Sequence, residues 1–108
     1  MMNALLFSVY DPQLRNVILH RSRYNSHIQG RHLFITVDAI RATIENPDFI
    51  ANDVNSDFVE NYYAQGMIEN DPDAFLKVCV LFKNEQGRVL TAFGVDRPKW
   101  SEEILWQK

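Results

Sequence analysis

The feature that most constrains this fold is a pair of apolar segments joined by a short polar turn. Phe75–Lys83 is rich in β-branched and aromatic residues and is apolar on both faces apart from its lysines. Such a segment is typical of a strand at the centre of a sheet, with a neighbour on each side. Asn84-Glu85-Gln86-Gly87 predicts a hairpin turn, after which residues 89–95 return as the partner strand.

Two helices are predicted before this hairpin. Ser22 is expected to cap a helix that runs to about Gly30. Thr36 is expected to cap a second helix, which ends at Asn46-Pro47 because proline disfavours helical geometry in the residue before it. The apolar stripe of this second helix consists of Val37, Ile40 and Ile44.

The predicted fold class is α+β, with an N-terminal β-hairpin and helices packed on one face of a four- to five-stranded antiparallel sheet. Antiparallel pairing is expected because most connections between the predicted elements are local. The 108 residues are expected to form a single domain. A short C-terminal element with Trp100, Ile104 and Trp106 is expected to cover a sheet edge or the core. The other predicted strands are residues 5–10, 15–20, 49–51 and 58–64.

The cysteine content and the distribution of apolar residues bear on the compartment. Cys79 is the only cysteine, so no intramolecular disulfide can form, and its apolar surroundings are typical of a core residue in a reducing compartment. The apolar run in residues 1–9 has no basic stretch before it and no small-residue cleavage site after it, which indicates a strand rather than a signal peptide. No apolar run approaches the roughly 20 residues of a membrane span. We therefore expect a cytoplasmic protein without a membrane partner.

Charge is distributed unevenly along the chain, although the net charge is only −3. Residues 15–32 contain four arginines and all three histidines but no acidic residue, whereas residues 45–73 contain eight carboxylates and no lysine or arginine. Two interpretations stay open at this stage. In the first, the folded chain presents a cationic surface despite its acidic pI. In the second, folding brings the basic and acidic blocks together in surface ion pairs.

The basic segment contains the residue types that metal-independent RNA cleavage requires. Attack of a 2′-hydroxyl on the adjacent phosphate needs a base, an acid and a cation that stabilises the charge on the phosphoryl oxygens. His27 and His32 are candidates for base and acid, since histidine exchanges protons readily near neutral pH. Arg23 or Arg31 is the candidate phosphate clamp, because the planar guanidinium matches phosphate oxygens. Surface or capping histidines beside solvated arginines are the alternative.

The spacing of the two histidines limits how they can act together. Five residues separate His27 from His32, which places them about 140° apart on a straight helix. They can converge only if the chain turns at Gly30. Their spacing also fits no standard zinc pattern, so we expect no metal and no cofactor. A serine or cysteine nucleophile is not indicated either, because there is no Gly-x-Ser-x-Gly sequence and Cys79 lies in mid-strand.

Thr91 interrupts the apolar run of the last predicted hairpin strand. Its hydroxyl could bind a phosphate oxygen if it faces a cleft, but threonine is also an ordinary strand residue. The hairpin register decides between these roles. If all four turn residues lie outside the ladder, Thr91 shares a face with Val80 and Phe82. A bulge at the turn glycine instead places it with Lys77 and Leu81.

The order of three short motifs resembles that of a known nuclease group. They are His-Ile-x-x-x-His at 27–32, a helix end Ile-x-Asn-Pro-Asp-x-Ile at 44–50, and Val-Leu-Thr-Ala-Phe at 89–93. Together they resemble the phage-barnase–EndoU–colicin–RelE-like nucleases over residues 15–95. Two features depart from the pattern. Leu33 follows the second histidine where related sequences often have proline, and the middle segment is acidic.

This resemblance implies an RNA-cleaving cleft on the open face of an antiparallel sheet. It implies catalytic roles for His27, His32 and Thr91, while Arg23, Arg31 and Arg88 are substrate-binding candidates from their chemistry. The expected function is therefore that of a small, toxin-like ribonuclease of phage or mobile-element type. RNA is its expected partner, with an inhibitor or antitoxin protein as a second one. The alternative is a non-catalytic interaction module that uses acidic residues 45–73.

Overall fold

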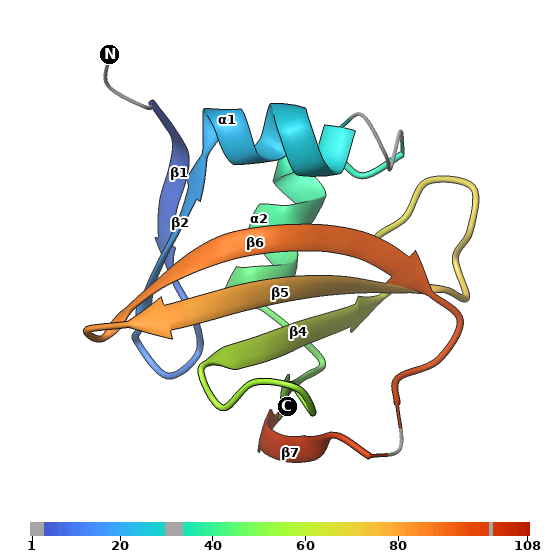
Figure 1. Ribbon diagram of the computed structural model, residues 1–108. Helices are drawn as coiled ribbons and strands as arrows, with labels where there is room; N and C mark the ends of the chain where they lie inside the picture. Colours follow the sequence, from blue (N-terminus) through green and yellow to red (C-terminus); the bar gives the residue numbers. More distant parts are fainter. Residues whose placement is uncertain (1–3, 30–33, 100) are drawn as a thin grey trace.

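The computed structural model describes residues 4–29, 34–99 and 101–108. Among these residues, seven strands form one mixed sheet in the order β1-β2-β6-β5-β4-β3-β7, and α2 packs behind it (Figure 1). The α+β class is therefore confirmed, but the expected four or five strands were too few. The elements are, in chain order, β1 (Leu5–Tyr10), β2 (Asn16–His20), α-helix α1 (Arg21–Arg23), π-helix η1 (Tyr24–Gln29), α2 (Val37–Glu45), β3 (Phe49–Asn52), β4 (Val59–Gln65), β5 (Phe75–Lys83), β6 (Gln86–Val95) and β7 (Glu103–Gln107).

The expectation of a purely antiparallel sheet was wrong, because β2 pairs with β6 in parallel. The pairs β1–β2, β3–β4, β4–β5 and β5–β6, each joined by a local connection, are antiparallel, as such connections favour. The β2–β6 pair joins segments about seventy residues apart, with Asn16 opposite Gln86 and Ile18 opposite Arg88. Local connectivity does not govern such a pair.

The turn between β5 and β6 is shorter than the sequence indicated. Only Asn84 and Glu85 lie outside the ladder, with φ of 54° and 67°, and Lys83 pairs with Gln86. Positive φ at both central residues is the hairpin turn whose twist matches that of the flanking strands. Gly87 is therefore a ladder residue. A Cβ at Gly87 would lie 2.7 Å from Val80 Cγ1 and 2.8 Å from the ring of Phe82, so glycine makes room for the packing of these two side chains.

The first helical segment begins earlier than predicted. His20 occupies the N-cap position of α1 without a side-chain hydrogen bond, so the expected cap at Ser22 was wrong. The helix then widens into η1, where Ile28 points into the core. The predicted end of this helix at Gly30 lies outside the described residues.

The second helix agrees closely with its prediction. Thr36 Oγ1 accepts a hydrogen bond from the backbone N–H of Ala39 at 3.0 Å, as an N-cap should, and α2 ends before Asn46. Ile40 and Ile44 are fully buried against the sheet. Within the described part of the chain, no helix is long and apolar enough to cross a membrane.

The C-terminal residues form an edge strand. β7 pairs antiparallel with β3, and Trp106 lies opposite Ile50 and packs partly buried against the core. The expectation that this element covers a sheet edge is met by Trp106. Ile104 remains half exposed, and Trp100 lies outside the described residues.

A polar cluster centred on Arg15 connects the turn of the N-terminal hairpin to strand β4. The guanidinium donates two hydrogen bonds to Glu60, at 2.9 and 2.8 Å, and its Nε donates to the buried carboxylate of Asp11 at 3.0 Å. It also lies 4.1 Å above the ring of Phe82, and Tyr62 donates its hydroxyl to Asp11. Burial alone would lower the pKa of Arg15, but Glu60 and the other negative groups raise it above its ordinary value, so the charge is retained.

Replacing Arg15 with alanine should lower the free energy of unfolding by about 2–3 kcal/mol, because Asp11 and Glu60 would lose their shared cationic partner. Arg41→Ala is the matched control, since Arg41 forms only an exposed pair with Glu45 at 3.3 Å. Its expected cost is about 0.5 kcal/mol or less. Urea unfolding of both variants measures the difference. Equal losses would contradict a central role for the Arg15 cluster.

Candidate functional site

The sheet face turned away from α2 carries many polar side chains of the central strands, and we call it the open face. The segment that contains Glu102 covers part of it, where Asn61, Tyr63 and Lys77 are buried. Strand pairing places Asn61, Cys79 and Thr91 side by side in one row, and Tyr63, Lys77 and Phe93 in the next. The alternate residues of the same strands, such as Val78 and Ala92, are fully buried on the side of α2.

A β-bulge in β6 determines which of its side chains reach the open face. Cys79 pairs with Thr91 and Val80 with Val89, so Leu90 is an extra residue in the ladder. Arg88 and Thr91 are three residues apart and would point to opposite faces of a regular strand. The bulge turns both toward the open face. Thr91 therefore lies on the face of Lys77 and Leu81, as in the second of the two registers left open by the sequence, although the bulge that places it there is at Leu90 and not at Gly87.

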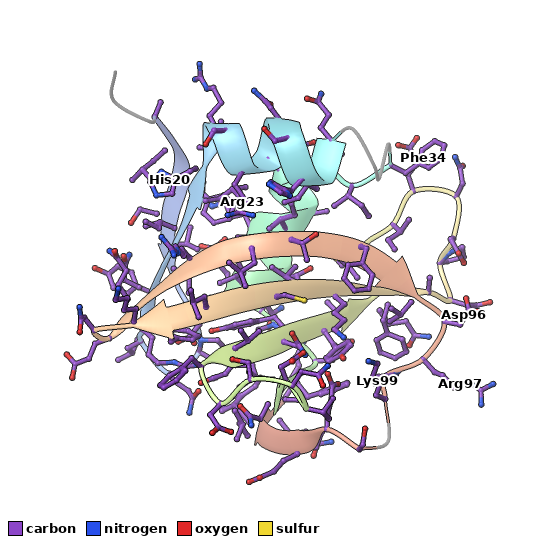
Figure 2. All side chains as sticks on the ribbon, in the orientation of Figure 1. His20, Arg23, Phe34, Asp96, Arg97 and Lys99 are labelled. Atoms are coloured by element: carbon purple, nitrogen blue, oxygen red, sulfur yellow. The ribbon has the colours of Figure 1, made fainter. Side chains whose placement is uncertain are left out.

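The α1–η1 segment runs beside β6 and supplies two further candidates. Arg23 and His27 are four residues apart, so they lie on roughly the same side of the helical segment, and both α1 and η1 contact β6. Figure 2 shows Arg23 extending from α1 toward β6. His27 is exposed within the π-helical turn, whereas the next residue, Ile28, is buried. Short π-helical turns are often found at functional sites.

The structure thus describes four of the six predicted site residues. His27 and Arg23 lie on the helical segment beside β6, and Arg88 and Thr91 lie on the open face. His32 and Arg31 lie outside the described residues. Tyr24 donates its hydroxyl to the carbonyl of Ile35 at 2.8 Å, which ties η1 to the residues just before α2.

His20 is a further histidine at the start of this region. It is half buried at the junction of β2 and α1, and its Nδ1 is buried without a hydrogen-bond partner among the described residues. Figure 2 shows it at the opposite end of the view from Arg97 and Lys99. Its place in the basic segment was evident from sequence, but its burial was not.

Most described lysines and arginines of the basic segment and of the β5–β6 hairpin have no carboxylate partner among the described residues. Within the described ranges, Arg15 is the one arginine of residues 15–32 that forms an ion pair with the acidic segment. The acidic segment uses Asp48 and Asp53 for its own loops, where they accept backbone hydrogen bonds from Gln65 and Asn55. The described contacts therefore favour a cationic surface over mutual neutralisation of the two blocks. The cations left without a carboxylate within 4.0 Å among the described residues include Arg21, Arg23, Lys83 and Arg88.

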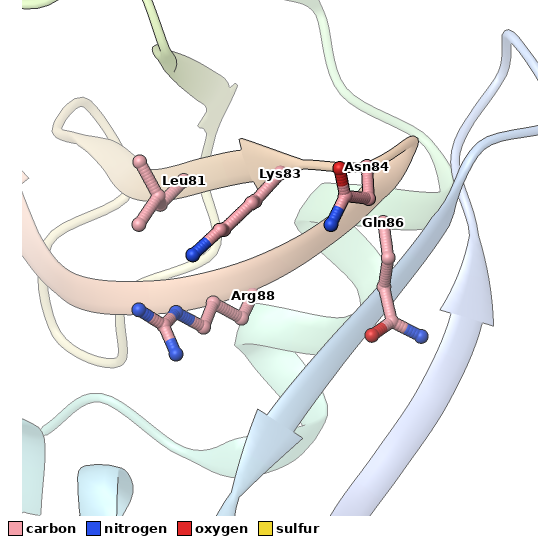
Figure 3. Close-up of a pocket in the computed structure, with 5 residues that line it drawn as sticks. All are labelled: Leu81, Lys83, Asn84, Gln86 and Arg88. Carbon is pink, nitrogen blue, oxygen red and sulfur yellow. The ribbon is translucent and has the colours of Figure 1, made fainter.

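Two of these cations line a cleft at the end of the β5–β6 hairpin. The cleft has a volume of about 430 Å³ and is lined by Leu81, Lys83, Asn84, Gln86 and Arg88. Figure 3 shows the side chains of Lys83 and Arg88 extending in the same direction from the two strands. Sequence analysis missed Lys83 because the length of the turn determines which residues of β6 share its face.

A second polar cluster on the open face was also missed by sequence analysis. The buried carboxylate of Glu102 accepts hydrogen bonds from the hydroxyl of Tyr63 and, at 2.6 Å, from the amide of Asn61. Lys77 Nζ lies 3.6 Å from the same carboxylate. Burial, followed by the hydrogen bond to Glu102, raises the pKa of Tyr63 well above its ordinary value. These contacts hold Glu102 over the sheet, and its carboxylate has two hydrogen-bond donors and a nearby ammonium group.

A neighbouring cavity of about 310 Å³ lies between the sheet and the segment that contains Glu102. Phe49, Pro98 and Ile104 give it a largely apolar lining, to which Arg97 and Lys99 also contribute. The carboxylate of Glu102 is already held by Tyr63 and Asn61. We therefore assign the cluster a structural role.

No metal centre is formed by the residues that the structure describes, since no three histidine, cysteine or carboxylate side chains gather within it. Comparisons with protein-family models, curated proteins and solved structures found no match to this chain.

Cys79 should react slowly with alkylating reagents. Burial raises the pKa of its thiol from 9.0 to about 11, which lowers the thiolate fraction at pH 8 about a hundredfold. A more basic thiolate is a better nucleophile, so the net decrease in rate is roughly tenfold. Iodoacetamide at pH 8 should therefore modify the native protein roughly tenfold more slowly than the urea-unfolded chain. The difference should shrink as the pH rises toward 11. Equal rates at pH 8 would contradict the burial of the thiol.

Proposed function

We propose that this protein is a small, metal-independent ribonuclease that uses histidine for acid and base catalysis. The observation that carries the proposal is the gathering of Arg88 and Thr91 on the open face, beside the helical segment that bears Arg23 and His27. The described part of this region has cations without carboxylate partners, a hydroxyl and an exposed histidine. These are the groups that stabilise and protonate a phosphodiester during cleavage.

The reaction that suits these groups is attack of an RNA 2′-hydroxyl on its own phosphorus. One histidine removes the proton from the 2′-hydroxyl, and the other donates a proton to the departing 5′-oxygen. The products are a 2′,3′-cyclic phosphate and a free 5′-hydroxyl. His27 and His32 share these two proton transfers, while Arg23 or Arg31 binds the charged phosphoryl oxygens. Thr91 donates a hydrogen bond to the same oxygens. Arg88 contacts the substrate strand beside the cleavage site.

A second candidate function is that of a non-catalytic interaction module. Asp57, Glu69, Asp71 and Asp73 are exposed and have no cationic partner among the described residues. Such a surface would suit a basic protein partner. It would require neither His27 nor the open face.

The ribonuclease proposal predicts cleavage of a labelled mixed-sequence RNA in the presence of EDTA, with 2′,3′-cyclic phosphate ends. His27→Ala and His32→Ala should each lower the rate about 10²- to 10⁴-fold, the usual contribution of acid–base catalysis. Because the side chain of His27 is exposed, its replacement should leave the fold intact. An RNA with 2′-deoxy sugars throughout should resist cleavage, since it lacks the attacking hydroxyl.

Arg41→Ala is the control for this assay, because Arg41 lies on α2, behind the sheet, and should leave the rate unchanged. Thermal unfolding of every variant checks that the fold is retained. If the wild type leaves RNA intact at high protein concentration across neutral pH, the ribonuclease proposal is wrong. The acidic interaction surface then becomes the better candidate.

A further inference from the structure

We propose that the end of the β5–β6 hairpin is a subsite for single-stranded nucleic acid, where Lys83 and Arg88 bind phosphates and Phe58 stacks on a base. This inference rests on the proposed function, because that function identifies the bound strand as RNA. It adds a place where the strand is held next to the cleavage site. We call this region the hairpin-end surface. It consists of Phe58, Leu81, Lys83, Asn84, Gln86 and Arg88.

The phosphate-binding half of the surface is the 430 Å³ cleft between the two strands. Lys83 pairs with Gln86 and Leu81 with Arg88, so all four side chains lie on the open face. The ammonium and the guanidinium extend over the same cleft (Figure 3). Neither cation has a carboxylate within 4.0 Å among the described residues, so both are available to an external anion.

The base-stacking half is a hollow of about 420 Å³ on the other side of Lys83. It is lined by Phe58, Leu81, Phe82, Lys83 and Asn84, three of which also line the cleft. Phe58 has 69% of its surface exposed, yet its backbone is fixed, because its carbonyl accepts the N–H of Phe82 at 2.9 Å. An exposed aromatic ring on a fixed backbone provides a platform for stacking at little cost in conformational entropy.

The start of β4 explains why this hollow is open. β4 begins at Val59, opposite Leu81, so no residue of β4 pairs with the last two residues of β5. Phe82 itself is not available for stacking, since Arg15 covers its ring at 4.1 Å. Phe58 is therefore the ring that a base can reach.

The chemistry of this surface fits a single strand better than a duplex. Stacking on Phe58 requires a base whose face is free, and an aromatic side chain beside a cationic groove is the usual platform for single strands. The amides of Asn84 and Gln86 add polar contacts. Gln86 is held in place, because its Nε2 donates to Asn16 Oδ1 at 2.9 Å. Asp57 and Glu85 lie close in sequence but line neither hollow.

The test is the binding of a fluorescein-labelled 12-nucleotide oligothymidine, measured by anisotropy over a series of salt concentrations. This probe has no 2′-hydroxyl, so its binding is independent of cleavage. Phe58→Ala should weaken binding roughly tenfold, as expected for the loss of one stacked base, and leave the salt dependence unchanged. The double variant Lys83→Gln, Arg88→Gln should reduce the slope of log K against log salt by about 1.4, because each phosphate contact in a single strand contributes about 0.7.

Ile104→Ala is the control for Phe58, since Ile104 is an exposed apolar residue on the edge strand β7 and lines neither hollow of the hairpin-end surface. Arg41→Gln is the control for the two cations. Both should bind the probe like the wild type. A duplex of the same length should lose little affinity in Phe58→Ala.

The outcomes separate this inference from the ribonuclease proposal. If the wild type binds the probe but cleaves no RNA, and the variants behave as expected, the subsite stands and the catalytic proposal fails. If RNA is cleaved but the variants bind the probe as tightly as the wild type, the subsite is wrong and the catalytic proposal stands. Absence of binding to the probe at low salt, or equal losses for single strand and duplex in Phe58→Ala, overturns the subsite.

Discussion

The parallel pairing of β2 with β6 is the constraint on which the cationic side of the molecule depends. It joins the N-terminal hairpin to the antiparallel strands that follow α2. Since α1 begins directly after β2, this pairing also brings α1 and η1 alongside β6. Arg15 strengthens the junction by reaching across to Glu60 on β4 and by stacking on Phe82. The basic segment is thereby held next to the open face.

The bulge at Leu90 determines which side chains of β6 lie on the open face. In a regular strand, either Arg88 or Thr91 would point toward α2, where a cation would be costly to bury. With the bulge, both reach the open face, and the two-residue turn places Lys83 on the same side. Thr91 and the candidate phosphate-binding groups at the hairpin end thus share the open face, and η1, which bears His27, lies beside the same strand, β6. The acidic loop between β4 and β5 lies at the end of the sheet opposite the β5–β6 turn, the end toward which η1 runs (Figure 1).

The sequence predicted the features that depend on local chemistry. These include the α+β class, the central position of β5 and the Thr36 cap of α2, each of which follows from a few neighbouring residues. The sequence did not predict the features that depend on contacts between distant segments of the chain. Parallel pairing of β2 with β6 and the contacts of Glu102 with Tyr63 join residues far apart in the chain. The face of Thr91 depended on a one-residue bulge, and the relation between Arg88 and Lys83 depended on the two-residue length of the turn.

The central claim is that nucleic acid binds on the open face beside β6, and amide chemical-shift mapping tests it most directly. Isotope-labelled protein is titrated with the non-cleavable oligothymidine, and the perturbed amides are compared with the fold. We predict the largest changes in residues 21–29 and 81–93, with little change in α2. Changes confined to α2 or to acidic residues 69–73, or no changes at all, would contradict the claim.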